Sequence, residues 1–232
     1  MRYYFVLLVS SLLLGSCRTL KIQDFHQQAA LTQPMPPLAL KVHAESFLGH
    51  FAGDLANDML ADAAMSRPGP WLPFPSPYEV HSRIAEPMRD VFTVLGNELT
   101  DNMLQPAGAP HGQIRFKLLY YQSRTPGWGW VIPSVFTLNI ANLAGMPFLR
   151  YRIDLELQME ILDRNQRVVA QYRAPGNGKS TVAMYYGYTG REAYRKANLL
   201  ALQDAMRAIR AKMEPDLSSL RDDLLAAGPE KK

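Results

Sequence analysis

The sequence predicts an α+β domain in which an antiparallel sheet of about four to six strands is packed by two or three amphipathic helices. Three observations lead to this class: a long stretch that alternates apolar and polar residues, several stretches with apolar residues three and four positions apart, and turn residues between them. The chain has 232 residues, of which 47% are hydrophobic and 10% aromatic, and this composition can build a sizeable core. Helices laid on an antiparallel sheet form a common layered architecture.

The first predicted elements are a strand over residues 38–44 and an amphipathic helix over Phe47–Met65. A proline-rich loop, residues 67–77, precedes a second helix, and Ser76, Pro77 and Glu79 supply its capping box. We expect this helix to be interrupted at Pro87 and to end before Gln105. Its apolar stripe consists of Val80, Ile84, Met88, Val91, Leu95, Leu99 and Met103.

Two strands follow in the predicted order. Residues 114–121 alternate, and one face of this strand is predicted to hold Ile114, Phe116, Leu118 and Tyr120. Residues 149–161 alternate over thirteen positions, which is typical of an antiparallel strand with one buried and one solvated face. We interpret its charged residues as cross-strand ion pairs; they are Arg150, Arg152, Asp154, Glu156 and Glu160.

Turns at residues 163–166 and at 175–178 predict two further strands, over residues 167–173 and 179–186, which complete a meander. A capping box at residues 189–192 then opens a last long helix, which Pro215 ends. Residues 216–227 are expected to form a short helix or a frayed tail. The long helix has a stripe of large residues and a face of small residues, so it should lie close on the sheet. The stripe is Leu199, Leu202, Met206, Ile209 and Met213, and the small face is Ala197, Ala201, Ala205 and Ala208.

The amino terminus has the pattern of an export signal. Arg2 precedes a short apolar run, which is too short to span a bilayer, and residues 14–17 read LGSC. This segment resembles the lipobox of bacterial lipoproteins, and the resemblance implies removal of residues 1–16 and attachment of acyl chains such as palmitate to Cys17. Cys17 is the only cysteine, and an unpaired thiol in an exported protein calls for a reason. An ordinary secretory signal with a stray cysteine and a short membrane anchor remain alternatives.

The lipobox resemblance also implies a place in the cell. Arg18, and not Asp, follows the cysteine, so the resemblance implies the outer membrane of a Gram-negative cell, with the protein facing the periplasm. Residues 17–37 are then the lipidated cysteine and a tether, and residues 38–232 are a single periplasmic domain. The order of the predicted elements resembles the small α/β domains of periplasmic assembly lipoproteins, such as the curli-secretion lipoprotein class.

An insert without any charged residue occupies positions 125–149. Three interpretations stand: a buried hairpin or flap over the core, a hairpin that contacts a membrane or a partner, and a spanning segment, which its glycines and prolines disfavour. The contact interpretation names Trp128, Trp130, Val135, Phe136 and Leu138 as candidate membrane or partner contacts.

No familiar catalytic pattern occurs in the sequence. Residues 174–180 (APGNGKS) lack the first glycine of a P-loop, because position 173 is Arg173, and no strand-to-helix context follows. No metal-binding His or Cys spacing and no nucleophile elbow is present. We therefore expect no catalytic residue, no metal and no cofactor, and the near balance of 25 basic and 21 acidic residues argues against a nucleic-acid partner.

These features predict a lipid-anchored cell-envelope protein that is not an enzyme and serves as a structural or accessory module. Its expected partners are the membrane, through lipidated Cys17, and envelope proteins. The alternative function is the binding of an apolar ligand, such as a lipid tail, between the sheet and the insert.

Overall fold

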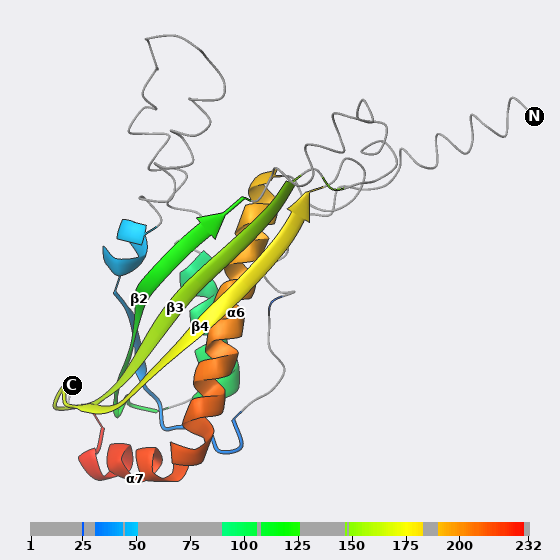
Figure 1. Ribbon diagram of the computed structural model, residues 1–232. Coiled ribbons are helices and arrows are strands. Elements are labelled where there is room, and N and C mark those ends of the chain that lie inside the picture. The colour runs from blue at the N-terminus through cyan, green and yellow to red at the C-terminus, as the bar shows by residue number, and fades with distance from the viewer. Residues whose placement is uncertain are drawn as a thin grey trace, which may run out of the picture.

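Four strands form one sheet in the computed structural model, which describes residues 25, 31–43, 45–50, 90–105, 108–125, 147, 149–182 and 190–229. They are β1 (Ala39–Val42), β2 (Gly112–Arg124), β3 (Leu149–Asp163) and β4 (Val168–Val182), and they lie in the order β1-β2-β3-β4. Helices pack against the sheet from one side (Figure 1). The α+β class and the expected number of strands are therefore confirmed.

The sheet is mixed, whereas the sequence predicted an antiparallel one. β1 pairs in parallel with β2, in a register that runs from Ala39 opposite Gln113 to Val42 opposite Phe116. The physical reason is the connection, because helical residues at 45–50 and 90–98 lie between the two strands. A crossover of this kind returns the chain in its original direction, as parallel pairing requires.

β4 is a single strand of fifteen residues, and the turn predicted at residues 175–178 is wrong. Gly176 pairs with Leu155 and Gly178 pairs with Ile153, so the ladder with β3 continues through both glycines. Their role is close packing. A Cβ atom built on Gly176 would lie 2.0 Å from the carbonyl oxygen of Ala201, and one on Gly178 would lie 1.8 Å from that of Ala197. Glycine inside a strand marks such a close approach of another backbone.

The backbone that approaches β4 belongs to α6 (Gly190–Met213), as the predicted small-residue face required. Ala197, Ala201 and Ala205 are fully buried, whereas Ala208 is only partly buried. The predicted stripe of large residues from Leu199 to Met213 is buried as well. A 3₁₀ turn, η3 (Glu214–Asp216), contains Pro215 and ends α6, and α7 (Leu217–Ala227) follows as a regular helix.

The second predicted helix is described from residue 90 onward. Residues 90–98 are α-helical and continue into a π-helical turn, η2 (Leu99–Met103). The amide of Leu104 donates to the carbonyl of Leu99 at 2.9 Å, which ends the helix where the sequence predicted. Val91, Leu95, Leu99 and Met103 are all buried. The capping box at Ser76, the break at Pro87 and most of the predicted helix over Phe47–Met65 lie outside the described residues.

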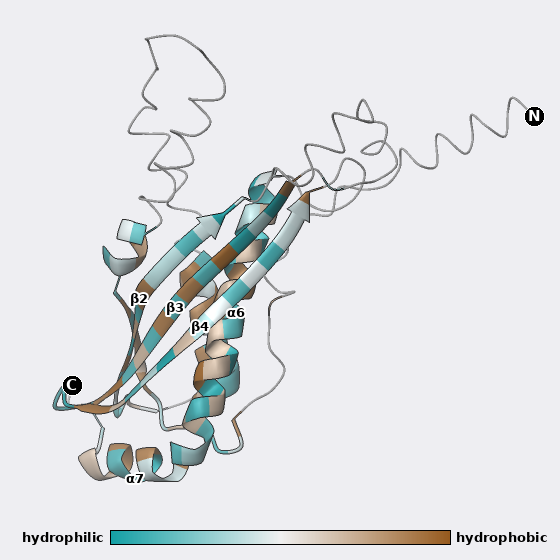
Figure 2. Cartoon of the chain, viewed as in Figure 1, coloured by the Kyte–Doolittle hydropathy of each residue, from teal (hydrophilic) through white to brown (hydrophobic). Residues whose placement is uncertain are grey.

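The inner face of the sheet and the helix stripes share one hydrophobic core (Figure 2). Phe116, Leu157 and Met159 are among its fully buried members. One predicted core residue is outside it: a β-bulge after Leu118 turns Tyr120 outward, where it is 46% exposed, and brings Tyr121 inward. A bulge inserts one residue and so reverses the facing of every later side chain on that strand.

The folded body also includes residues that the sequence assigned to the tether. Leu31 and Met35 are buried in the core, and their amides donate to the carbonyls of Asn102 and Met103, each at 2.9 Å. Phe25 is 7% exposed and packs with Val94 and Leu199. The boundary at residue 37 therefore lies inside the packed structure, because these apolar side chains find partners on η2 and α6.

Candidate functional site at the cationic end of the sheet

The sequence-predicted site residues lie outside the described part of the chain. This holds for Cys17 and for all five candidate contact residues, Trp128, Trp130, Val135, Phe136 and Leu138. The strand residues on either side of the insert are described. β2 ends at Arg124 and β3 begins at Leu149, and Arg124 pairs with Arg152. The insert is thus the connection of an antiparallel hairpin, and it leaves the sheet at one defined end.

The face of the sheet opposite α6 is polar. Outward positions on the central rows carry Arg115, Glu160 and Gln171, then Lys117, Gln158 and Arg173, as the strand registers place them side by side. Figure 2 shows this alternation of hydrophilic and hydrophobic residues along β2, β3 and β4. The solvated face predicted for residues 149–161 is confirmed except at Gln158, which is buried: Arg150 and Arg152 are exposed while Ile153 and Leu155 are buried.

Positive charge accumulates at the end of this face from which the insert leaves. Arg124, Arg152 and Lys179 are direct neighbours across β2, β3 and β4. Arg150 lies two residues along β3 from Arg152 on the same face, and all four side chains are exposed. We call Arg124, Arg150, Arg152 and Lys179 the cationic end.

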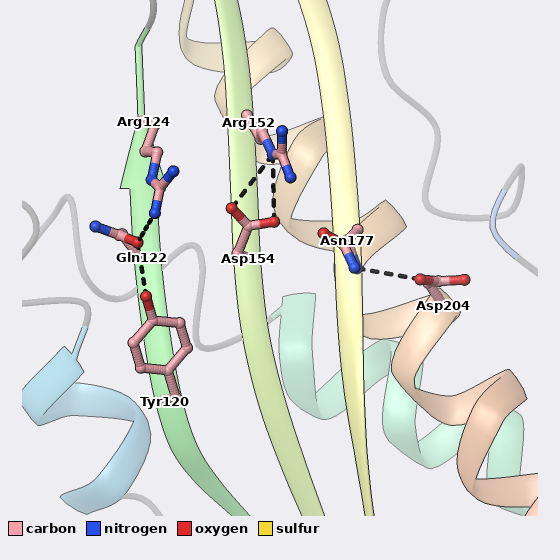
Figure 3. A network of polar contacts seen from close by, with 7 residues as sticks. All are labelled: Tyr120, Gln122, Arg124, Arg152, Asp154, Asn177 and Asp204. Atoms are coloured by element: carbon pink, nitrogen blue, oxygen red, sulfur yellow. Dashed lines mark hydrogen bonds and ion pairs between the residues drawn. The ribbon is translucent and has the colours of Figure 1, made fainter.

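One carboxylate in the adjacent row partly balances the cationic end. The Nε atom of Arg152 lies 3.3 Å from both carboxylate oxygens of Asp154 (Figure 3). This pair joins two positions of the same strand, so the predicted cross-strand pairing of Arg152 is wrong: both of its cross-strand neighbours are cations. Like charges directly opposite each other destabilise a sheet.

The neighbouring polar contacts hold this end of the sheet in place. The Oε1 atom of Gln122 accepts hydrogen bonds from the Tyr120 hydroxyl at 2.6 Å and from Arg124 Nη2 at 2.5 Å. On the outer edge of β4 in the described sheet, the backbone amide of Asn177 donates to Asp204 Oδ2 on α6 at 3.1 Å (Figure 3). Edge amides that are paired in this way are not available to another strand.

A partly buried cluster of tyrosine hydroxyls lies on the inner side of the same end. The hydroxyl of Tyr121 donates to Asn198 Oδ1 at 2.6 Å and lies 2.8 Å from the hydroxyl of Tyr194. The ring of Tyr194 meets that of Tyr151 edge to face, with centroids 5.7 Å apart. Sequence reasoning missed this cluster because the bulge that brings Tyr121 inward depends on strand pairing. Its groups satisfy one another, which is what buried polar side chains require.

Two ion pairs join the helix at residues 90–98 to α6 beneath the sheet. Arg195 binds Asp90 through both Nε and Nη2, and Arg210 Nη1 lies 3.1 Å from Glu98 Oε1. Asp90 and Glu98 are almost completely buried. These contacts explain the buried charges as parts of helix packing, since buried charges in proteins are paired.

The chemistry that the cationic end offers is the binding of anions. Arginine presents a planar fork of donors to carboxylates and phosphates, and lysine adds a point charge. Among the described residues, no group of three or more His, Cys, Asp or Glu side chains is placed to hold a metal ion. In the same part of the chain, no helix has the length and apolar composition needed to cross a bilayer.

The fold and its polar face define a two-layer α+β domain in which the described helices cover one face of the sheet. It is similar to the solved structure of a protein described as a "putative lipoprotein" from Caulobacter crescentus CB15, with a TM-score of 0.34 and 14% sequence identity. The similarity covers 56% of this chain and 83% of that chain. At this level the likeness carries no conclusion about function. No family model and no curated protein match the sequence.

Proposed function

We propose that this chain is a lipid-anchored cell-envelope protein whose domain serves as a structural or accessory module. The observation that carries the proposal is the docking of Phe25 against Val94 and Leu199, with the lipobox-like cysteine only eight positions upstream. Eight extended residues span at most about 28 Å, so acyl chains on Cys17 would hold the folded body next to the bilayer. The lipobox resemblance and Arg18 support the outer membrane, with the domain facing the periplasm.

The polar sheet face supports docking to other envelope components. The described helices occupy one side of the sheet, and the opposite side presents exposed cations from β2, β3 and β4 together with half-buried carboxylates from β3. Exposed charged faces favour fast and specific encounters with complementary surfaces. The uncharged insert, with Trp128 and Trp130, is our second proposed contact region.

The test of the anchor is mass spectrometry of the mature protein isolated from membranes. We expect an N-terminus at residue 17 with acyl chains on the cysteine, and we expect Cys17→Ala to leave the membrane fraction. An unmodified Cys17, or an N-terminus elsewhere, would contradict the proposal. For the accessory role, cross-linking in cells should capture envelope proteins, whereas substrate turnover by a partnerless chain would contradict it.

Binding of an apolar ligand is the alternative function. The space between α6 and the sheet is filled by the protein's own side chains, including Leu157, Met206 and Ile209. A lipid tail would therefore have to lie against the insert. Native mass spectrometry of gently extracted protein would detect a co-purifying lipid, and its consistent absence would exclude this alternative.

A further inference from the structure

We propose that the cationic end of the sheet binds the headgroups of anionic phospholipids in the bilayer that holds Cys17. The domain would then stand with this end against the membrane. The inference deepens the proposed function, since it takes the lipid anchor as its first attachment and adds a second, electrostatic one.

The first argument is the density of charge. Arg124, Arg152 and Lys179 are adjacent on three strands, and strands lie about 4.8 Å apart, so the three side chains start from a row about 10 Å wide. Together with Arg150 they make four cations beside one carboxylate, that of Asp154. In the rows farther along the face, Arg115, Lys117 and Arg173 lie among two carboxylates, Glu156 and Glu160. The excess of positive charge is thus three at the cationic end and one over the rest of the face.

The opposite end of the molecule carries no such excess, because the acidic residues of η3 and α7 offset the nearby basic residues Arg164, Arg167 and Lys212. η3 and α7 contain Glu214, Asp216, Asp222 and Asp223 but only one basic residue, Arg221. Figure 1 shows α7 at the end of the sheet opposite to the end where β2 stops and β3 begins. A domain with this uneven charge is oriented by a negatively charged surface, which attracts the cationic end more strongly than the nearly balanced far end.

The third argument is the distance that the chain can span between the lipid anchor at Cys17 and the folded domain. Phe25 docks beside Leu199, within the stretch of α6 that faces Gly176 and Gly178, and Gly178 directly precedes Lys179. Cys17 can lie about 28 Å from Phe25 when the chain is extended. The six residue steps from Gly176 to Val182 extend about 20 Å toward the end of β4, so the bilayer can meet the cationic end while the anchor stays inserted. The span from Cys17 to Phe25 is compatible with several orientations of the domain on the membrane. The charge of the cationic end favours the orientation in which this end faces the bilayer.

The experiment uses the full lipidated chain reconstituted into vesicles of neutral or of 30% anionic phospholipid. A donor dye is attached at Thr181→Cys, near the cationic end, or at Asn165→Cys, in the turn at the far end, and the acceptor is a labelled headgroup. We expect energy transfer from position 181 to exceed that from position 165 in anionic vesicles. The difference should vanish in neutral vesicles and in high salt, because the attraction is screened within about 10 Å at 0.1 M ionic strength.

A matched pair of variants separates the cationic end from net charge. Arg124→Gln with Arg152→Gln and Lys179→Gln removes three charges from it, and Arg115→Gln with Lys117→Gln and Arg173→Gln removes three from the rest of the face. We expect the first to weaken docking about fivefold for each cation lost, and the second to leave it nearly unchanged. All six positions are on the polar face, so thermal melting serves as the control for folding.

The outcomes are distinct. Equal energy transfer from position 181 to the labelled headgroups in neutral and anionic vesicles would overturn the proposal. An equal loss of docking to anionic vesicles in both triple variants would overturn it as well. Cross-links from position 181 to an acidic protein, with no response to anionic lipid, would assign the surface to a protein partner and overturn it too. Mass spectrometry of the same sample reports on Cys17 separately. If Cys17 carries no lipid, the dye-labelled chain with Cys17→Ser should still approach anionic vesicles and not neutral ones.

Discussion

Tyr172 illustrates how one hydroxyl ties two layers of the molecule together. It lies on β4, and its hydroxyl donates to Asp216 Oδ2 in η3 at 3.0 Å. Burial raises the pKa of Tyr172 above its ordinary value of 10.0, and the hydrogen bond to Asp216 and the charge of Asp216 raise it further. The folded state therefore keeps this proton at a pH at which the unfolded chain releases it.

This pKa shift predicts a loss of stability in alkali. The contribution of Tyr172 is fully present below about pH 10 and is lost as the pH rises toward its higher folded pKa. Tyr172→Phe should be less stable than the natural chain by about 1 kcal/mol at neutral pH, and this difference should shrink above pH 10. Urea unfolding between pH 7 and 11 measures it. Tyr120→Phe, which removes an exposed hydroxyl on β2, is the control, and a Tyr172→Phe difference independent of pH would contradict the prediction.

At the scale of elements, the contact between β4 and α6 organises the fold. Gly176 and Gly178 let the helix backbone approach the strand, and Ala197, Ala201 and Ala205 complete the close contact from the helix side. Both partners are small, and a methyl group added to either glycine would overlap main-chain atoms, which cannot rotate away. The interface therefore depends on the absence of side chains.

Gly178→Ala should consequently destabilise the domain strongly. The new Cβ would meet the carbonyl oxygen of Ala197 at 1.8 Å and the amide nitrogen of Ala201 at 2.7 Å, so the helix must move. We expect a loss of about 3 kcal/mol in the free energy of unfolding, at the upper end of overpacking costs. Gly49→Ala is the control, because nothing lies within 4 Å of its added Cβ and it lies in a helix, where alanine is favoured by up to about 1 kcal/mol. Equal melting of the two variants would mean that α6 does not pack this closely.

At the scale of the whole molecule, the insert and the folded body are separable in our proposal. The strands that flank it are already in register, with Arg124 opposite Arg152 and Ser123 opposite Ile153, and the described core has helices and strands with matching apolar faces. A short turn can close such a hairpin. The insert would then serve contact and not folding.

Deletion of the insert tests this separation. Joining Arg124 to Arg150 through a short Gly/Ser turn should preserve a single cooperative melting transition while reducing association with membrane or partner. Thermal unfolding and vesicle flotation of the same preparation give the two measurements. Loss of the cooperative transition would show that Trp128, Trp130 and their neighbours belong to the core.

Several elements follow from the sequence by itself. The alternation in residues 149–161, the stripe from Val91 to Met103 and the alanine face of α6 appear in the structure as predicted, except that Gln158 is buried and Ala208 is only partly buried. These patterns depend only on the spacing of residues along one strand or helix, and burial of one face follows from that spacing. The lipobox-like segment is equally local, and it remains a prediction that the described residues do not test.

Tertiary contacts decided the remainder. Residues 175–178 have the composition of a turn, but the proximity of α6 and pairing with β3 keep them in a strand. The parallel pairing of β1, the outward facing of Tyr120 and the docking of Phe25 each require partners far away in the chain. The cationic end likewise depends on contacts between residues that are distant in the sequence. Arg124, Arg152 and Lys179 are 28 and 27 positions apart in the sequence, and only the register of three paired strands makes them neighbours, because register is set by packing across the sheet and not by any one strand.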